Sequence, residues 1–61
     1  MDDRESITER LRDIAEALND LSMRILSEAI SSGATSRPPE EKSVSQARRA
    51  VEKAIHLLRE N

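Results

Sequence analysis

The chain has 61 residues, no Cys, a single His, no aromatic residue and a formal net charge of −2 at neutral pH. A chain this short forms one domain at most, near the lower size limit for folding alone. Without Cys or a His cluster, neither disulfide bonds nor a structural metal can support it. Association with another chain is the support that remains.

The charged residues alternate in sign along the chain, which is typical of solvated helical surfaces. Residues 1–31 carry four Arg and eight Asp or Glu, whereas residues 39–61 carry five basic and four acidic residues. The first segment is thus net acidic and the second slightly basic. Eight of the ten basic residues are Arg, which is compatible with a GC-rich bacterial genome.

No apolar run approaches the length of a membrane span, and no basic and then apolar leader segment is present. We therefore expect a cytoplasmic protein with no membrane partner. The composition also lacks most catalytic residue types, and no phosphate-binding glycine loop, nucleophile–base arrangement or metal-ligand motif is found. The sequence predicts a protein that is not an enzyme and binds no cofactor.

The first predicted element is a long amphipathic helix over about residues 4–31. Large aliphatic residues recur there at alternating spacings of four and three, an a/d heptad pattern. They are Ile7, Leu11, Ile14, Leu18, Leu21 and Ile25. Ser6 and Glu9 match a capping box at the helix start, and Asp3 is the alternative start.

A loop and a second helix follow. Residues 32–38 combine the only Gly with small hydroxyl residues and lead into two prolines, which predicts a loop. The second helix is predicted over about residues 39–60, beginning at Pro39, with Ser43 as the alternative start. Its apolar residues are again spaced by three and four, and they include alanines that would let the larger aliphatic residues of the first helix approach closely. They are Val44, Ala47, Val51, Ala54 and Leu58.

Together the elements predict an all-α fold: a two-helix antiparallel hairpin that forms a single domain over residues 1–61. A lone hairpin leaves its apolar stripes open on one side, so we expect a homodimer that closes into a four-helix bundle, in preference to a trimer or tetramer. The predicted core of the hairpin and dimer comprises Ile7, Leu11, Ile14, Leu18, Leu21, Ile25, Val44, Ala47, Val51, Ala54 and Leu58.

A second, shorter apolar strip is formed by Met23, Leu26 and Ile30, rotated from the main stripe. If these residues are exposed together, they form a docking patch for another protein. The alternative is that they complete the bundle core near the loop, and we prefer that interpretation.

Glu28 occupies a d position when the heptads are counted strictly. Because a straight helix drifts away from a seven-residue repeat, we expect Glu28 to face water near the helix end. The alternative is a contact with Arg48 or Arg49 that sets the register of the two helices.

His56 has Glu52 and Glu60 one turn away on either side, a spacing that can hold a divalent metal. A His near a helix C-terminus is also favoured by the helix dipole whether or not it binds anything. We prefer this second interpretation and predict no metal site.

Arg48, Arg49 and Lys53 form the only candidate nucleic-acid face. The chain has no aromatic residue to stack on a base and its net charge is negative, so we do not expect a nucleic-acid partner. In size and plan the chain resembles the dimeric helical-hairpin RNA-binding proteins of the repressor-of-primer type. That resemblance covers architecture, which does not confer function.

The sequence therefore predicts a small helical hairpin that acts as a self-associating protein–protein interaction module, with a protein partner that it does not identify. The alternative is a small regulatory nucleic-acid-binding protein that uses Arg48, Arg49 and Lys53. Salt-dependent retention on nucleic acid, weakened by Arg49→Glu, would separate the two.

Overall fold

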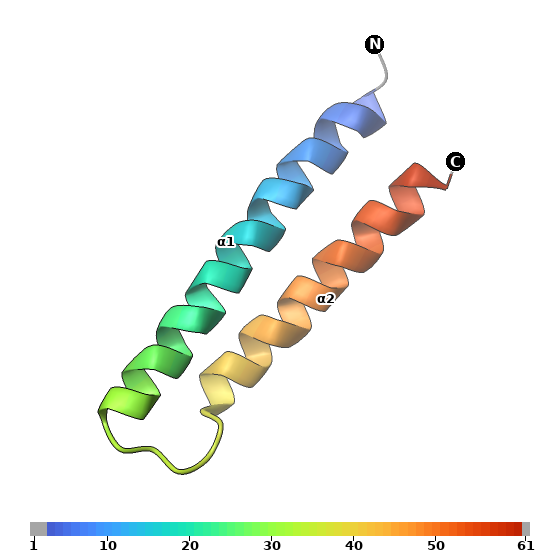
Figure 1. The fold of residues 1–61 in the computed structure, drawn as a ribbon. Coiled ribbons are helices and arrows are strands. Elements are labelled where there is room, and N and C mark those ends of the chain that lie inside the picture. The colour runs from blue at the N-terminus through green and yellow to red at the C-terminus, as the bar shows by residue number, and fades with distance from the viewer. Residues whose placement is uncertain (1–2, 61) are drawn as a thin grey trace.

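The computed structural model describes residues 3–60, which form two antiparallel α-helices joined by one loop (Figure 1). Helix α1 spans Asp3–Ser31 and helix α2 spans Pro39–Arg59. The helices pack side by side into a rod that measures 49 × 14 × 11 Å. The start of α1 and the end of α2 lie at one end of the rod and the loop lies at the other. The predicted all-α hairpin is thus confirmed.

Helix α1 begins at Asp3 rather than at the predicted capping box. Ser6 lies inside the helix, so its hydroxyl is not at the N-cap and the capping-box prediction is wrong. Asp3 and Glu5 lie in the first turn of α1, where the positive end of the helix dipole stabilises carboxylates. This favourable charge is compatible with the earlier of the two predicted starts.

Gly33 ends α1 by adopting a left-handed backbone conformation, with φ of 81°. The Gly33 N–H donates to the Ile30 carbonyl at 3.0 Å, and the Ala34 N–H donates to the Ala29 carbonyl at 2.9 Å. These two bonds define a Schellman motif, which satisfies carbonyls that the helix end would leave unpaired. The only Gly of the sequence therefore lies where a positive φ is required.

Helix α2 begins at Pro39, the first of the two predicted starts. Pro38 precedes it in an extended conformation, and its carbonyl accepts hydrogen bonds from the N–H groups of Glu41 and Lys42 at 3.1 and 3.3 Å. Proline suits the first helical position because an N–H there would have no partner within the helix. The two prolines therefore turn the chain and start the second helix.

The two helices meet along a seam in which α1 supplies the small side chains. Thr8, Ala15, Ser22 and Ala29 recur every seventh residue and are buried or half-buried. Larger residues alternate with them along α1 and face a half-buried aliphatic row of α2. The aliphatic residues of this seam include Leu11, Leu18 and Ile25 of α1 and Val44, Val51, Ile55 and Leu58 of α2. The alanines of α2, which the sequence pairs with the large aliphatic residues of α1, are only partly used in this seam: Ala54 is half-buried and Ala47 is exposed.

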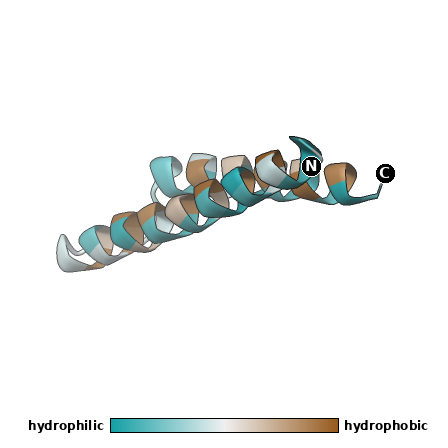
Figure 2. Cartoon of the chain, turned by 90° about the horizontal axis from the view of Figure 1, so that it is seen from above, coloured by the Kyte–Doolittle hydropathy of each residue, from teal (hydrophilic) through white to brown (hydrophobic). Residues whose placement is uncertain are grey.

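No apolar side chain within residues 3–60 is fully buried. The buried residues are Thr8, Ser22 and Glu41, which are 5, 9 and 3% exposed. Thr8 satisfies its hydroxyl by donating to the Arg4 carbonyl at 2.7 Å. Hydrophobic residues instead recur along the whole of both helices (Figure 2). The hairpin is therefore one layer of half-buried contacts and has no closed core.

Neither of the two described helices is long and apolar enough to cross a membrane.

Candidate interaction surface

Large aliphatic side chains of α1 lie exposed along one flank of the seam. Ile7, Ile14 and Leu21 are 45, 47 and 38% exposed. They recur every seventh residue, so they form a straight row along the helix, which we call the aliphatic strip. Monomeric proteins seldom expose a continuous row of large apolar side chains without a binding role.

The opposite flank of the seam carries a polar contact between the helices in its middle part. Arg48 of α2 donates a hydrogen bond to Asn19 Oδ1 of α1 at 3.0 Å. The same two residues line a shallow open pocket together with Glu16 and Glu52. This part of the surface is charged, and we call Glu16, Asn19, Arg48 and Glu52 the polar face.

The aliphatic strip lies on the side opposite to the polar face. Successive residues of an α-helix are rotated by about 100°. Taking the half-buried row through Leu18 as the reference, this rotation places Asn19 to one side and Ile14 and Leu21 to the other. The aliphatic strip and the polar face are thus separated by the seam.

Helix α2 contributes alanines to the same side as the aliphatic strip. Relative to the half-buried row through Val51, Arg48 turns toward the polar face, whereas Ala47 and Ala54 turn away from it. Ala47 and Ala50 are exposed and Ala54 is half-buried. We call Ala47, Ala50 and Ala54 the alanine strip, and the two strips together the apolar face. Leu57, which is 52% exposed and lies seven residues after Ala50, continues the alanine strip toward the end of α2 as its one large residue.

The structure thus divides the predicted core into two groups. One group forms the seam within the hairpin and comprises Leu11, Leu18, Ile25, Val44, Val51 and Leu58. The other group lies on the apolar face and comprises Ile7, Ile14, Leu21, Ala47 and Ala54. The heptad pattern contained both groups because a and d residues of one helix can face two different neighbours.

The second apolar strip stays on one side of α1, because its residues are three and four positions apart on a continuous helix, but α2 covers only part of it. Leu26 is half-buried, but Met23 and Ile30 are 61 and 75% exposed. Leu26 and Ile30 also line a shallow pocket against the loop, with Pro38 on its other side. Met23 and Ile30 lie on the polar-face side of the seam, so they do not extend the apolar face.

Glu41 is a buried carboxylate in the seam that sequence reasoning did not identify. Its Oε1 accepts hydrogen bonds from the hydroxyls of Ser22, at 2.7 Å, and Ser45, at 2.8 Å. Arg37 of the loop pairs with both carboxylate oxygens and also donates to Ser45 Oγ at 3.1 Å. This cluster connects α1, the loop and α2 at one end of the hairpin.

The hydrogen bonds from Arg37 and then from Ser22 lower the pKa of Glu41 from 4.5 to about 2, although burial raises it. Hydrogen bonds and a neighbouring cation favour the ionised form more strongly than burial disfavours it. Glu41 therefore stays charged near neutral pH. A sequence signal was present: Glu41 lies seven residues before Arg48, at the same seam position of α2.

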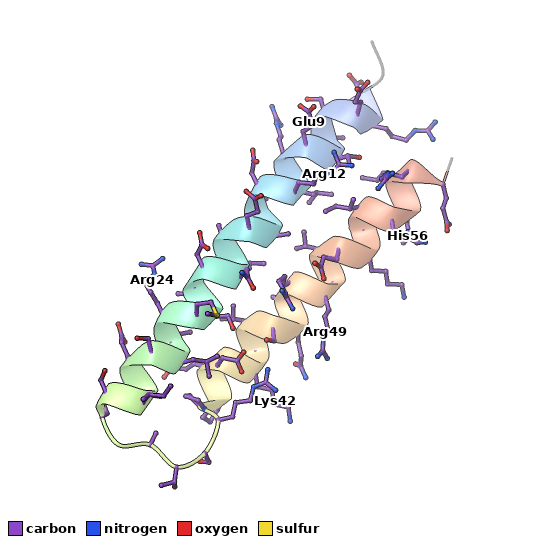
Figure 3. All side chains as sticks on the ribbon, viewed as in Figure 1. Glu9, Arg12, Arg24, Lys42, Arg49 and His56 are labelled. Carbon is purple, nitrogen blue, oxygen red and sulfur yellow. The ribbon has the colours of Figure 1, made fainter. Side chains whose placement is uncertain are left out.

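The candidate nucleic-acid residues do not share one surface. Arg48 is half-buried and bonded to Asn19, whereas Arg49 and Lys53 are exposed. Figure 3 shows Arg49 projecting from the side of α2 that faces away from α1. The hairpin therefore presents two of the three basic side chains on its outer side and uses the third in the contact between helices.

Glu28 is exposed, as predicted for a residue near the end of α1. The register contact that was its alternative is not formed within the hairpin, because Arg48 pairs with Asn19 and Arg49 points away from α1 (Figure 3). Two polar contacts between the helices, Asn19 with Arg48 and Ser22 with Glu41, were not predicted.

His56 Nε2 lies 2.9 Å from Glu60 Oε1, and both side chains are largely exposed, at 74 and 56%. Within residues 3–60 no group of three His, Asp or Glu side chains lies close enough to hold a metal ion. The His56–Glu60 pair is an exposed contact at the end of α2.

Comparison with known proteins gives no relatives: no protein-family model, no curated protein and no solved structure matches the chain. Function must therefore be inferred from the hairpin itself.

Proposed function

We propose that this chain is a non-enzymatic helical hairpin that self-associates through its apolar face into a homodimeric four-helix bundle and serves as a protein–protein interaction module. The observation that carries the proposal is the absence of any buried apolar side chain in residues 3–60, while large aliphatic residues form a row on one face. A second layer of helices over that face would supply the missing core.

The exposed area of the hairpin supports this proposal. A folded monomer of 6.9 kDa exposes about 4,000 Å² by the usual scaling of surface with mass. The hairpin exposes 4926 Å², which is about 900 Å² more. Each partner in a standard-size interface buries roughly 800 Å². The excess therefore matches the area that one copy would contribute to a dimer.

A second copy fits the apolar face better than an unrelated partner does, because the face is complementary to itself. It carries a row of large side chains on α1 beside a row of small ones on α2, and well-packed bundles set large residues against small ones. A two-fold axis can bring the aliphatic strip of each copy onto the alanine strip of the other copy. The polar face, with Asn19 and Arg48, then stays in solvent.

Substitution on the two faces tests the proposal. Ile14→Glu should weaken association at least about 100-fold, because each copy loses an aliphatic burial of about 1.5–3 kcal/mol and the dimer loses two. Met23→Glu is the matched control on the polar-face side and should leave association unchanged. Sedimentation equilibrium of both variants measures the effect. Equal dissociation constants for Ile14→Glu and the parent chain would contradict the proposal.

A further inference from the structure

The proposed dimer can be assembled in two ways that differ in which helices meet. In a bundle whose neighbouring helices are all antiparallel, two hairpins with their loops at the same end pack α1 of one copy against α2 of the other. With their loops at opposite ends, α1 packs against α1 and α2 against α2. The composition of the apolar face distinguishes these arrangements.

Side-chain volume favours loops at the same end. The aliphatic strip of α1 consists of Ile7, Ile14 and Leu21, and the alanine strip of α2 consists of residues that are much smaller. Loops at the same end set each aliphatic strip against an alanine strip, twice, which gives an even spacing of the four helices. Loops at opposite ends set large residues against large and small against small. Because the two helices of a hairpin are held side by side, that pairing would crowd the α1 contact or leave a void at the α2 contact.

Charge favours the same arrangement. Helix α1, over Asp3–Ser31, has seven acidic and four basic residues, and helix α2, over Pro39–Arg59, has three acidic and five basic residues. The helices therefore carry net charges of −3 and +2 with His56 neutral. Loops at the same end place each acidic helix beside two basic ones. The opposite arrangement places α1 beside a second acidic helix, which costs free energy through like-charge repulsion.

We infer that two copies of this chain associate in parallel, with both loops at the same end, α1 of each copy against α2 of the other, and the aliphatic strip of each seated on the alanine strip of its twin. This inference rests on the proposed self-association. In this arrangement the start of α1 and the end of α2 of both copies lie together, at the end of the bundle away from the loops. Both polar faces stay on the outside of the bundle.

A single spin label in the loop tests the arrangement. The sequence contains no Cys, so Thr35→Cys introduces a unique labelling position at an exposed residue. With loops at the same end, the two labels of a dimer lie about 20 Å apart, roughly two helix-packing distances. With loops at opposite ends, their separation approaches the 49 Å length of the hairpin. Double electron–electron resonance measures this distance, and circular dichroism checks that the variant keeps its helices.

Sedimentation of the same labelled samples distinguishes a failure of the parallel arrangement from a failure of self-association itself. A dimer with the short distance supports the parallel arrangement. A dimer with the long distance overturns the arrangement and leaves self-association standing. A second variant, Glu5→Cys, labels the opposite end and should also give a short distance between twins. A monomer in sedimentation, with no measured distance between labels, would overturn the arrangement and the proposed function together.

Discussion

Glu41 is an ionised side chain with 3% exposure in a molecule that buries no aliphatic residue among those described. It is tolerated there because Arg37, Ser22 and Ser45 fill the hydrogen-bonding sites of its carboxylate. Buried charges are retained where they are paired in this way, and removing one partner is costly because the remaining charge is left without compensation. The cluster therefore fixes the register of the two helices near the loop.

The low pKa of Glu41 predicts a pH dependence of stability. Its folded-state pKa is lowered from 4.5 to about 2, so the stabilisation is present above pH 4.5 and is lost as the pH falls toward 2. Glu41→Gln should be less stable than the parent chain at pH 7, and the difference should shrink between pH 4.5 and pH 2. Thermal unfolding by circular dichroism at matched protein concentration measures it. A difference that stays constant from pH 7 to pH 2 would show that the ionised carboxylate is not the cause.

Gly33 is the residue whose backbone ends α1. Gly33→Ala places a side chain at a φ of 81°, which is strained for residues other than Gly even though there is space around the new Cβ. We expect a loss of about 1–2 kcal/mol in the free energy of unfolding, the usual cost of the left-handed conformation. Thr35→Ala, in the same loop but without a positive φ, should change it by less than about 0.5 kcal/mol. Urea unfolding measures both, and equal stabilities would contradict the role of Gly33.

At the scale of the helices, spacing alone was enough to predict the hairpin. The alternation of three and four identified both helices, and the Gly and the two prolines located the loop between them. What spacing could not show was which neighbour each apolar row faces. Rows through Leu11 and Ile14 are almost adjacent on α1, and the first turned out to face α2 while the second lies exposed.

Polar seam residues were missed for a related physical reason. A search for apolar periodicity passes over Ser22 and Glu41 because a buried Ser or Glu is stable only with particular partners from other elements. Those partners are brought together by the fold, and their spacing in the sequence does not reveal them. Of the candidate site, the aliphatic strip could be predicted from the sequence, whereas its separation from the seam and the polar cluster could not.

The row of small residues on α1 predicts that a larger side chain in the seam destabilises the hairpin. Ala15→Leu should force the helices apart and lower the free energy of unfolding by about 1–3 kcal/mol, as expected when a packed position is overfilled. Ser27→Leu introduces the same side chain at an exposed position of α1 and should leave the free energy of unfolding unchanged. Urea unfolding of the two variants at one protein concentration compares them. A stable Ala15→Leu variant would mean that the helices do not rely on close approach there.

At the scale of the whole molecule, the hairpin leaves a face of large aliphatic side chains uncovered, which the proposed dimer would bury. A chain of 61 residues must bury most of its aliphatic side chains to offset the entropy lost on folding, and this one leaves Ile7, Ile14 and Leu21 between 38 and 47% exposed. Charge, volume and exposed area support the proposed pairing of the apolar face with a second copy. In the proposed dimer, unfolding is coupled to dissociation, so the stability of the helices should depend on protein concentration.

The most direct test is the solution mass of the protein across a dilution series, measured by sedimentation with circular dichroism on the same samples. We predict a dimer that loses its helical signal over the same concentration range in which it dissociates. A fully helical monomer that persists at every concentration would contradict the account, because it would show that the single layer of half-buried contacts is sufficient to hold the two helices together.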